Sequence, residues 1–181
     1  MTNVRRHARH TRLLLATLAA LVISCWGIVD AQAADAPSSA GLAAPAVAGS
    51  YFKVVNRSSG KCMDIRQEDR PLGAHVQQYD CTGTDNQLWT AVPTGDGYYF
   101  LVSKQSGLCM AQFAGVLWML NCNGVTTQQW SAVAAGFEWN ELHHRASGLC
   151  AYATGTGNLA LEELTPCSAG SFSQHWQFVT V

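Results

Sequence analysis

The residues of this chain with the clearest chemistry are its cysteines. The sequence contains seven, of which Cys25 stands apart in an apolar N-terminal run. Two chemistries are open to the other six: zinc ligation or disulfide formation. Zinc sites use closely spaced Cys/His pairs, and none occurs in this sequence. The six are Cys62, Cys81, Cys109, Cys122, Cys150 and Cys167. An even set of cysteines indicates disulfides rather than a metal site when the chain is exported, as the N-terminal residues of this chain predict.

The histidines give no comparable sign of a catalytic or metal site. His143 and His144 are adjacent in a strand-like segment. Neighbouring side chains of a strand point to opposite faces, which disfavours joint chelation. No Ser or Cys stands in a nucleophile context. A glycosidase carboxylate pair is not excluded by spacing, because the fold assembles such pairs.

The elements that must position these residues form a threefold repeat. A Gln-x-Trp motif begins at Gln87, Gln128 and Gln174, at intervals of 41 and 46 positions. One cysteine precedes each motif, and another opens each unit within Ser-Gly-x-Cys. Self-similarity at this period marks a repeat architecture in which no unit buries a core alone. Because equivalent units should close in equivalent ways, we predict the disulfides Cys62–Cys81, Cys109–Cys122 and Cys150–Cys167.

Short apolar runs broken by Gly, Asn, Asp and Thr predict about four short strands per unit, or about twelve in all. No stretch keeps an apolar 3.6-residue period over three turns, so helices should be nearly absent. Aromatic and aliphatic positions also recur, and we predict that they form the core together with the three Trp. They are Tyr51, Tyr98 and Trp139; Val54, Leu101 and Leu142; and Val92, Val133 and Val179.

The N-terminal 33 residues have the order of parts of a secretory signal peptide. Four arginines precede an uncharged apolar run, and Ala31-Gln32-Ala33 follows as a cleavage site. Residues 34–50 read as a flexible Ala/Pro/Ser leader, and 51–181 as one folded domain. A lipid anchor at Cys25, in a loose lipobox, is the alternative. We therefore expect a secreted protein with no transmembrane segment after processing.

The net charge of the processed chain limits the classes of molecule that it is expected to bind. Removal of residues 1–33 leaves a net charge of about −4 with no basic patch. This balance argues against a nucleic-acid partner, because such binding depends on neutralising phosphates.

Three Gln-x-Trp motifs, three Ser-Gly-x-Cys turns and one cysteine pair per unit resemble the ricin B-chain-type lectins. The resemblance covers residues 51–181. It implies an all-β fold, the β-trefoil of three repeats, which also occurs in sugar-binding modules of secreted bacterial glycosidases. A trefoil accounts for every segment and is not expected to form a large cleft. We therefore expect no catalysis and no cofactor.

The resemblance also implies one sugar pocket in the first repeat. Asp64 would accept sugar hydroxyls at the rim, Tyr79 would stack on the sugar ring, and Gln77 and Asn86 would add polar contacts. Gln87 would orient Asp64 or nearby backbone, and Thr82 would lie at the rim. The second and third repeats lack the carboxylate. They carry Ala111 and Tyr152 in its place, Leu120 and Thr165 for the aromatic residue, and Thr127 and Ser173 for the asparagine.

The function implied is a monomeric, glycan-binding lectin. The rival class is a protein-binding trefoil, such as a protease inhibitor or effector. In that case Trp118, at the polar position of the second repeat, and the divergent third repeat would matter more than Asp64.

Overall fold

The computed structural model describes residues 50–66 and 72–181. The expected signal peptide, leader and Cys25 lie outside these residues.

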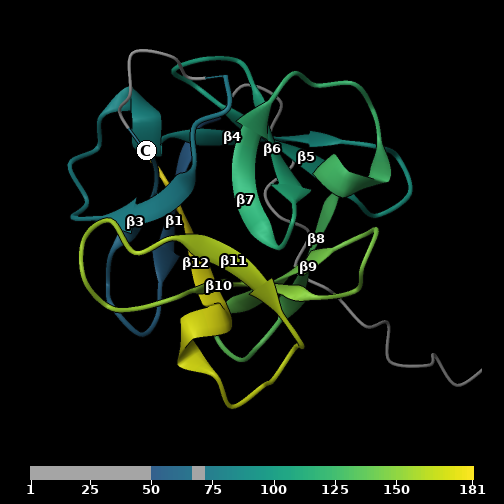
Figure 1. Ribbon diagram of the computed structural model, residues 1–181. Coiled ribbons are helices and arrows are strands. Elements are labelled where there is room, and N and C mark those ends of the chain that lie inside the picture. The colour runs from purple at the N-terminus through teal and green to yellow at the C-terminus, as the bar shows by residue number, and fades with distance from the viewer. Residues whose placement is uncertain (1–49, 67–71) are drawn as a thin grey trace, which may run out of the picture. The chain divides into compact units, whose positions relative to one another are not determined.

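The described chain is built from twelve short strands, as predicted, and contains no α-helix (Figure 1). Each repeat contributes four strands, with a single 3₁₀ turn before its Gln-x-Trp tryptophan. The first repeat has β1 (Phe52–Asn56), β2 (Cys62–Ile65), β3 (Val76–Tyr79), η1 (Asp85–Gln87) and β4 (Trp89–Pro93). The second has β5 (Tyr99–Ser103), β6 (Cys109–Phe113), β7 (Val116–Leu120), η2 (Thr126–Gln128) and β8 (Trp130–Ala134). The third has β9 (Asn140–His144), β10 (Cys150–Ala153), β11 (Glu162–Thr165), η3 (Phe172–Gln174) and β12 (His175–Thr180).

Six of the strands close into a barrel. β4 pairs with β5 and β8 with β9, while β12 returns along β1 in the register Phe52↔Thr180. Shorter pairings join β1 to β4, β5 to β8 and β9 to β12. Closure removes the exposed sheet edges that an open sheet would present. The remaining strands form the hairpins β2–β3, β6–β7 and β10–β11, one per repeat.

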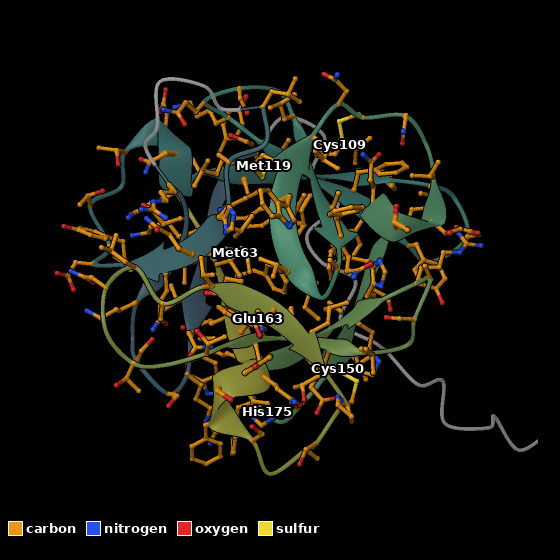
Figure 2. The ribbon with its side chains drawn as sticks, in the orientation of Figure 1. Met63, Cys109, Met119, Cys150, Glu163 and His175 are labelled. Atoms are coloured by element: carbon orange, nitrogen blue, oxygen red, sulfur yellow. A yellow bond between two sulfur atoms is a disulfide. The ribbon has the colours of Figure 1, made fainter. Side chains whose placement is uncertain are left out.

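The core is built from equivalent residues of the three repeats. Trp89, Trp130 and Trp176 are fully buried, and each indole donates a hydrogen bond to a carbonyl of the first hairpin strand of its own repeat. Val54, Leu101 and Leu142 are buried, as predicted, and Met63 and Met119 join them (Figure 2). The motif tryptophans are therefore packing residues.

The prediction that the recurring valines belong to the core is wrong for Val92 and Val133, whereas Val179 is partly buried. Val92 is 45% exposed and Val133 is 42% exposed. Each lies three residues after a buried tryptophan on the same strand. Because side chains alternate between the faces of a strand, an odd spacing from an inward residue places the valine outward.

Three basic residues, one from each repeat, form contacts between neighbouring repeats. Lys104 of the second repeat donates its backbone N–H to Leu88 of the first, and its ammonium lies 5.2 Å from the ring of Tyr51. Arg145 and Arg57 repeat this pattern, the latter joining the first repeat to the third. Their side chains lie over Tyr98 and Trp139, and their N–H groups donate to the carbonyls of Gln129 and His175.

The three disulfides form as predicted, one in each repeat. Each links the first strand of a hairpin to the loop after its second strand. The Cα–Cα separations are 5.0, 5.1 and 5.0 Å, so the three repeats are closed with the same geometry. Cys109 and Cys150, of the second and third disulfides, are labelled in Figure 2.

Candidate functional site

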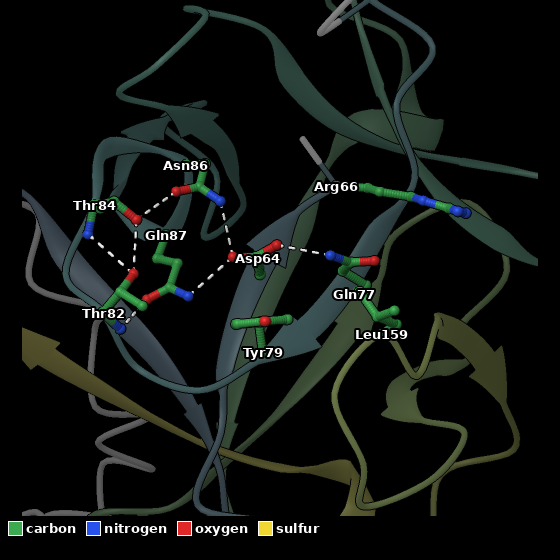
Figure 3. Close-up of a pocket in the computed structure, with 9 residues that line it drawn as sticks. All are labelled: Asp64, Arg66, Gln77, Tyr79, Thr82, Thr84, Asn86, Gln87 and Leu159. Atoms are coloured by element: carbon green, nitrogen blue, oxygen red, sulfur yellow. Dashed lines mark hydrogen bonds between the residues drawn. The ribbon is translucent and has the colours of Figure 1, made fainter. Parts of the chain in front are cut away.

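A pocket of about 420 Å³ opens over the β2–β3 hairpin of the first repeat (Figure 3). It contains all five residues that the sequence predicts to bind sugar. Its lining residues are Asp64, Arg66, Gln77, Tyr79, Thr82, Thr84, Asn86, Gln87 and Leu159.

Asp64 lies at the centre of this pocket. It faces Gln77 across the hairpin, and Gln77 Nε2 donates to Asp64 Oδ1 at 2.9 Å. Asn86 Nδ2 and Gln87 Nε2 donate to Oδ2 at 2.8 and 2.9 Å. The side chain is only 4% exposed. The expectation of a carboxylate at the rim is therefore wrong, because Asp64 is buried where it accepts hydrogen bonds from the three amides.

The hydrogen bonds of Asp64 limit what else it accepts. A carboxylate offers about four lone-pair sites, and three of them receive amide N–H groups. The site still open to a further donor belongs to Oδ1, which accepts from Gln77 alone. Asp64 is thus suited to one additional hydroxyl donor while the amides keep their positions.

Burial raises the pKa of Asp64 above its ordinary value of 3.8, and the hydrogen bonds from Gln77, Gln87 and Asn86 act in the opposite direction. Burial is the larger influence, because removing a carboxylate from water disfavours its charge.

Gln87 holds the site together from beneath and has no exposed surface. Its Oε1 accepts the backbone N–H groups of Thr82 and Gly83, and its Nε2 donates to the carbonyl of Asp80 as well as to Asp64. It therefore orients both the carboxylate and the loop after β3, as predicted, without surface for a ligand.

The clamp on the loop recurs in the other repeats. Gln128 accepts from the N–H of Asn123 and donates to Asn121. Gln174 accepts from Ser168 and donates to Pro166. Only in the first repeat does the motif glutamine also hold a carboxylate. The motif glutamine thus has a structural role in all three repeats, and in the first repeat it also orients the pocket carboxylate.

Two threonines extend the polar side of the pocket from Asn86 to solvent. Thr84 Oγ1 donates to Asn86 Oδ1 at 2.6 Å, which turns the Asn86 amide nitrogen toward Asp64. Thr82 Oγ1 lies 2.7 Å from Thr84 Oγ1. Both threonines are exposed, so Thr82 lies at the rim as predicted, and Thr84 is a further rim residue.

Tyr79 supplies the aromatic surface of the pocket. It pairs with Cys62 across the hairpin and is 37% exposed, whereas the strand residues before it are buried. Figure 3 shows its side chain beside Asp64, on the side opposite Asn86. A flat ring next to a hydrogen-bond acceptor suits a ligand with one C–H face and hydroxyl edges.

Sequence reasoning missed three lining residues: Arg66, Thr84 and Leu159. Arg66 and Thr84 belong to the first repeat but lie outside the motif spacing. Leu159 comes from the third repeat, between β10 and β11, so no comparison within one repeat indicates it.

The equivalent positions of the other repeats are occupied by internal contacts. In the second, Ala111 pairs with Trp118, whose ring lies 3.8 Å from that of His75 and whose Nε1 donates to the Phe113 carbonyl. In the third, the hydroxyl of Tyr152 donates to Glu163 at 3.2 Å. Neither arrangement holds a carboxylate among amides.

The histidines follow the alternation expected from the sequence. His144 is buried against Trp130, with 4.9 Å between the ring centroids, and His143 turns the other way to Glu141. Glu141, His143, Cys150 and Cys167 bring ligand atoms within 4.8 Å of one another. Both cysteines are in the third disulfide, however, so they offer no thiolate to a metal.

No helix among the described residues is long and apolar enough to cross a membrane.

Solved structures similar to this chain share its architecture. A designed threefold-symmetric protein, ThreeFoil, is 32% identical, with a TM-score of 0.68 over 72% of this chain and 99% of its own. An exo-β-1,3-galactanase from Clostridium thermocellum is 26% identical, with a TM-score of 0.67 over 74% of this chain but only 30% of its own. A ricin B-like lectin from Macrolepiota procera, solved with lactose, is 19% identical, with a TM-score of 0.61 over 71% of this chain and 94% of its own.

The family model for the ricin-type β-trefoil lectin domain matches residues 50–176. This range includes β1 to β11 and the start of β12, all three disulfides and the pocket. The chain therefore belongs to the ricin-type β-trefoil lectin domain family.

Proposed function

We propose that this protein is a secreted lectin that binds one sugar through the first-repeat pocket and performs no catalysis. The observation that carries the proposal is Asp64, a carboxylate fixed by three amides beside the exposed ring of Tyr79. A sugar hydroxyl would donate to Oδ1 of Asp64, and the C–H face of the sugar would lie on Tyr79. The hydroxyls of Thr82 and Thr84 would complete the polar contacts at the rim.

A single site is favoured because the other repeats lack the polar constellation. Ala111 has no acceptor to offer, and Tyr152 is engaged with Glu163. A shallow pocket with a few hydrogen bonds and one stacked ring should bind a monosaccharide at roughly 1 mM to 0.1 mM, about −4 to −5.5 kcal/mol. Multivalent relatives would exceed this strength by avidity.

Binding rather than hydrolysis is favoured by the composition of the pocket. Asp64 is the one carboxylate among the described residues that line it. Most glycosidases use two carboxylates that flank the scissile bond. Asp64 also accepts hydrogen bonds from three amides, which fix its orientation and suit recognition more than proton transfer.

Export and a monomeric state are further parts of the proposal. The three disulfides fit an oxidising compartment. We propose a signal peptide at residues 1–33, a leader at 34–50 and the lectin domain at 51–181. Sequencing of the exported protein should give an N-terminus at or near Ala34, whereas a lipid-modified Cys25 would establish the anchored form.

A glycan array followed by calorimetric titration tests the function. The processed protein should bind a sugar with a stoichiometry near one. Asp64→Asn keeps the shape of the side chain but points an N–H group at donors, so binding should fall at least about a hundredfold, from loss of a charge-assisted bond and a new donor clash. Tyr152→Phe, at the equivalent position of the third repeat, is the matched control and should leave binding unchanged.

Two outcomes would contradict the proposal. One is an Asp64→Asn variant that binds sugar as tightly as the parent. The other is a folded protein that binds no glycan but captures a protein partner in a way that Trp118→Ala abolishes, which would favour the protein-binding class.

A further inference from the structure

The pocket of the first repeat is completed by a loop of the third repeat. Residues 154–160, here called the Leu159 loop, connect β10 and β11. Leu159 is the lining residue that this loop contributes, and 56% of its surface is exposed. The apolar side of the pocket therefore consists of two side chains, Tyr79 and Leu159, from different repeats.

The position of the Leu159 loop is fixed by hydrogen bonds to β3. Gln78 exchanges backbone hydrogen bonds with the loop: its N–H donates to Ala160, and its carbonyl accepts from Leu159, both at 2.9 Å. The Gln78 side chain donates to the carbonyls of Gly155 and Gly157 at 2.6 and 3.1 Å. The loop is thus attached as a short extra strand beside the pocket hairpin.

A second anchor holds the tip of the loop next to Leu159. The Asp80 N–H donates to Asn158 Oδ1 at 3.0 Å, and Asn158 Nδ2 donates to Asp80 Oδ2 at 2.9 Å. Asp80 is also the residue whose carbonyl accepts from Gln87. The loop of the third repeat and the central carboxylate are therefore positioned by the same short segment after β3.

Leu159 holds this position in a costly backbone conformation. Its φ is 68°, in the left-handed region, which costs a residue with a side chain roughly 1–2 kcal/mol. A glycine at this position would adopt the same backbone conformation without that cost. A leucine kept exposed, at positive φ and at a pocket wall is better explained by a contact with ligand than by packing.

The sheet register shows the width of the pocket floor between β2 and the backbone that follows the Leu159 loop. Asp64 pairs with Gln77 on β3, and Gln77 forms a bridge to Leu161 on the far side. The pocket floor therefore spans three adjacent backbones, or roughly 10 Å at a strand spacing of about 4.8 Å. Figure 3 shows Leu159 beyond Gln77, at the end of the pocket away from Thr82. This span exceeds the width of one pyranose ring.

We propose that Leu159 is a specificity-determining residue that packs against the second sugar ring of a bound oligosaccharide. The inference rests on the proposed lectin function: the first ring occupies Asp64 and Tyr79, and the next ring along the glycan places its C–H face on Leu159. The site accordingly favours chains of sugars over monosaccharides.

The test compares monosaccharides with disaccharides for three proteins. Galactose, xylose and mannose are titrated, each as the free sugar and as a β-1,4-linked disaccharide of the same sugar, against the parent, Leu159→Gly and Leu159→Asn. Both variants tolerate positive φ, and Ala114→Gly is the matched control. Ala114 has a φ of 51° in the β6–β7 turn, outside the residues that line the pocket.

For the sugar that binds, the parent should prefer the disaccharide by about five- to tenfold, as expected for burying one leucine edge under a sugar ring. In both Leu159 variants this ratio should fall to about one, while the monosaccharide affinity and the thermal midpoint are kept. Ala114→Gly should keep the parental ratio.

The contrary results are distinct. An unchanged ratio in the Leu159 variants overturns the proposal, as does an equal loss for monosaccharide and disaccharide, which would place Leu159 against the first ring. If the parent binds no glycan on the array, or if Asp64→Asn binds the responsive sugar equally well, the lectin proposal fails and this one fails with it.

Discussion

Asp64 and Gln77 face each other across β2 and β3, with Gln77 Nε2 2.9 Å from Asp64 Oδ1. This hydrogen bond ties the central acceptor of the pocket to the hairpin that forms its floor. Together with the amides of Asn86 and Gln87, it fixes the carboxylate before any ligand arrives. A preorganised acceptor loses little rotamer freedom on binding, which suits a shallow site that makes few contacts.

The first prediction concerns the stability of the domain. Asp64→Ala should lower the free energy of unfolding by about 1–3 kcal/mol, because buried amide donors lose their acceptor. Chemical denaturation of the purified domain measures this change. Thr82→Ala, at the exposed rim, should change the stability by less than about 0.5 kcal/mol. Equal stability of Asp64→Ala and the parent would show that the amides find other acceptors.

Sugar binding should weaken as the pH falls. The ionised form of Asp64 accepts the ligand hydroxyl, and burial raises the pKa of Asp64 above 3.8. Protonation of the free protein therefore begins at a higher pH than for an exposed aspartate, and affinity should decline through that window. Titrations from pH 7 to pH 4, with circular dichroism to verify folding, measure the effect. Binding that is constant down to pH 4 would contradict it.

Glu162 predicts a second pH effect, on folding rather than binding. It is fully buried at a position where the other repeats carry Val76 and Leu117, and no hydrogen-bond partner is found for either carboxylate oxygen among the described residues. Burial raises the pKa of Glu162 well above 4.5. The folded state keeps a proton that the unfolded state releases, so the contribution of this proton to stability is fully present below pH 4.5 and is lost as the pH rises toward the folded pKa.

Two substitutions separate the contributions of Glu162. Glu162→Leu should raise the free energy of unfolding at pH 7 by about 1–3 kcal/mol, because an unpaired buried polar group is removed. It should also abolish the decline in stability with pH. Glu162→Gln should abolish the decline but keep most of the cost of a buried polar group. Denaturation curves between pH 4 and pH 9 distinguish the three proteins, and a parent whose stability is independent of pH would refute the assignment.

The parts of the fold that repeat could be predicted from the sequence, and those that depend on one repeat could not. The cysteine pairing and the buried tryptophans recur three times, so spacing was sufficient to predict them. The direction of Val92 was missed because recurrence does not reveal which face of a strand a residue occupies. The burial of Asp64 depends on three amides from separate segments, which converge only in the folded chain. Leu159 was missed because its contact joins the third repeat to the first.

The first disulfide should matter for binding more than the second. Cys81 lies between Asp80 and Thr82, whose backbone groups bind Gln87. Replacing Cys62 and Cys81 together with alanine should therefore lower both stability, by about 2–4 kcal/mol, and sugar affinity. Replacing Cys109 and Cys122 should lower stability by a similar amount and leave affinity unchanged. Thermal denaturation measures the stability, and titration below the unfolding range measures the affinity. Equal losses of affinity in the two double variants would show that binding depends on the stability of the whole domain and not on the first disulfide in particular.

Substitutions of Gln87 and Gln128 distinguish the structural role of the motif glutamine from its role in the sugar-binding pocket. Both clamp the loop after the second cysteine of their repeat, through an accepted backbone N–H and a donated bond to a carbonyl. Gln87 alone also donates to a carboxylate, Asp64 Oδ2, at 2.9 Å. Replacement of either by methionine keeps the volume and removes the polar bonds.

Gln87→Met and Gln128→Met should each lower the free energy of unfolding by about 1–3 kcal/mol, because buried backbone groups lose their partners. Only Gln87→Met should also weaken sugar binding, by about tenfold, since Asp64 is then free to turn away from its ligand-binding orientation. The two variants thus match in stability and differ in affinity. If Gln128→Met reduces the affinity as much as Gln87→Met does, the motif glutamine acts on binding through the fold alone, and its contact with Asp64 has no separate role.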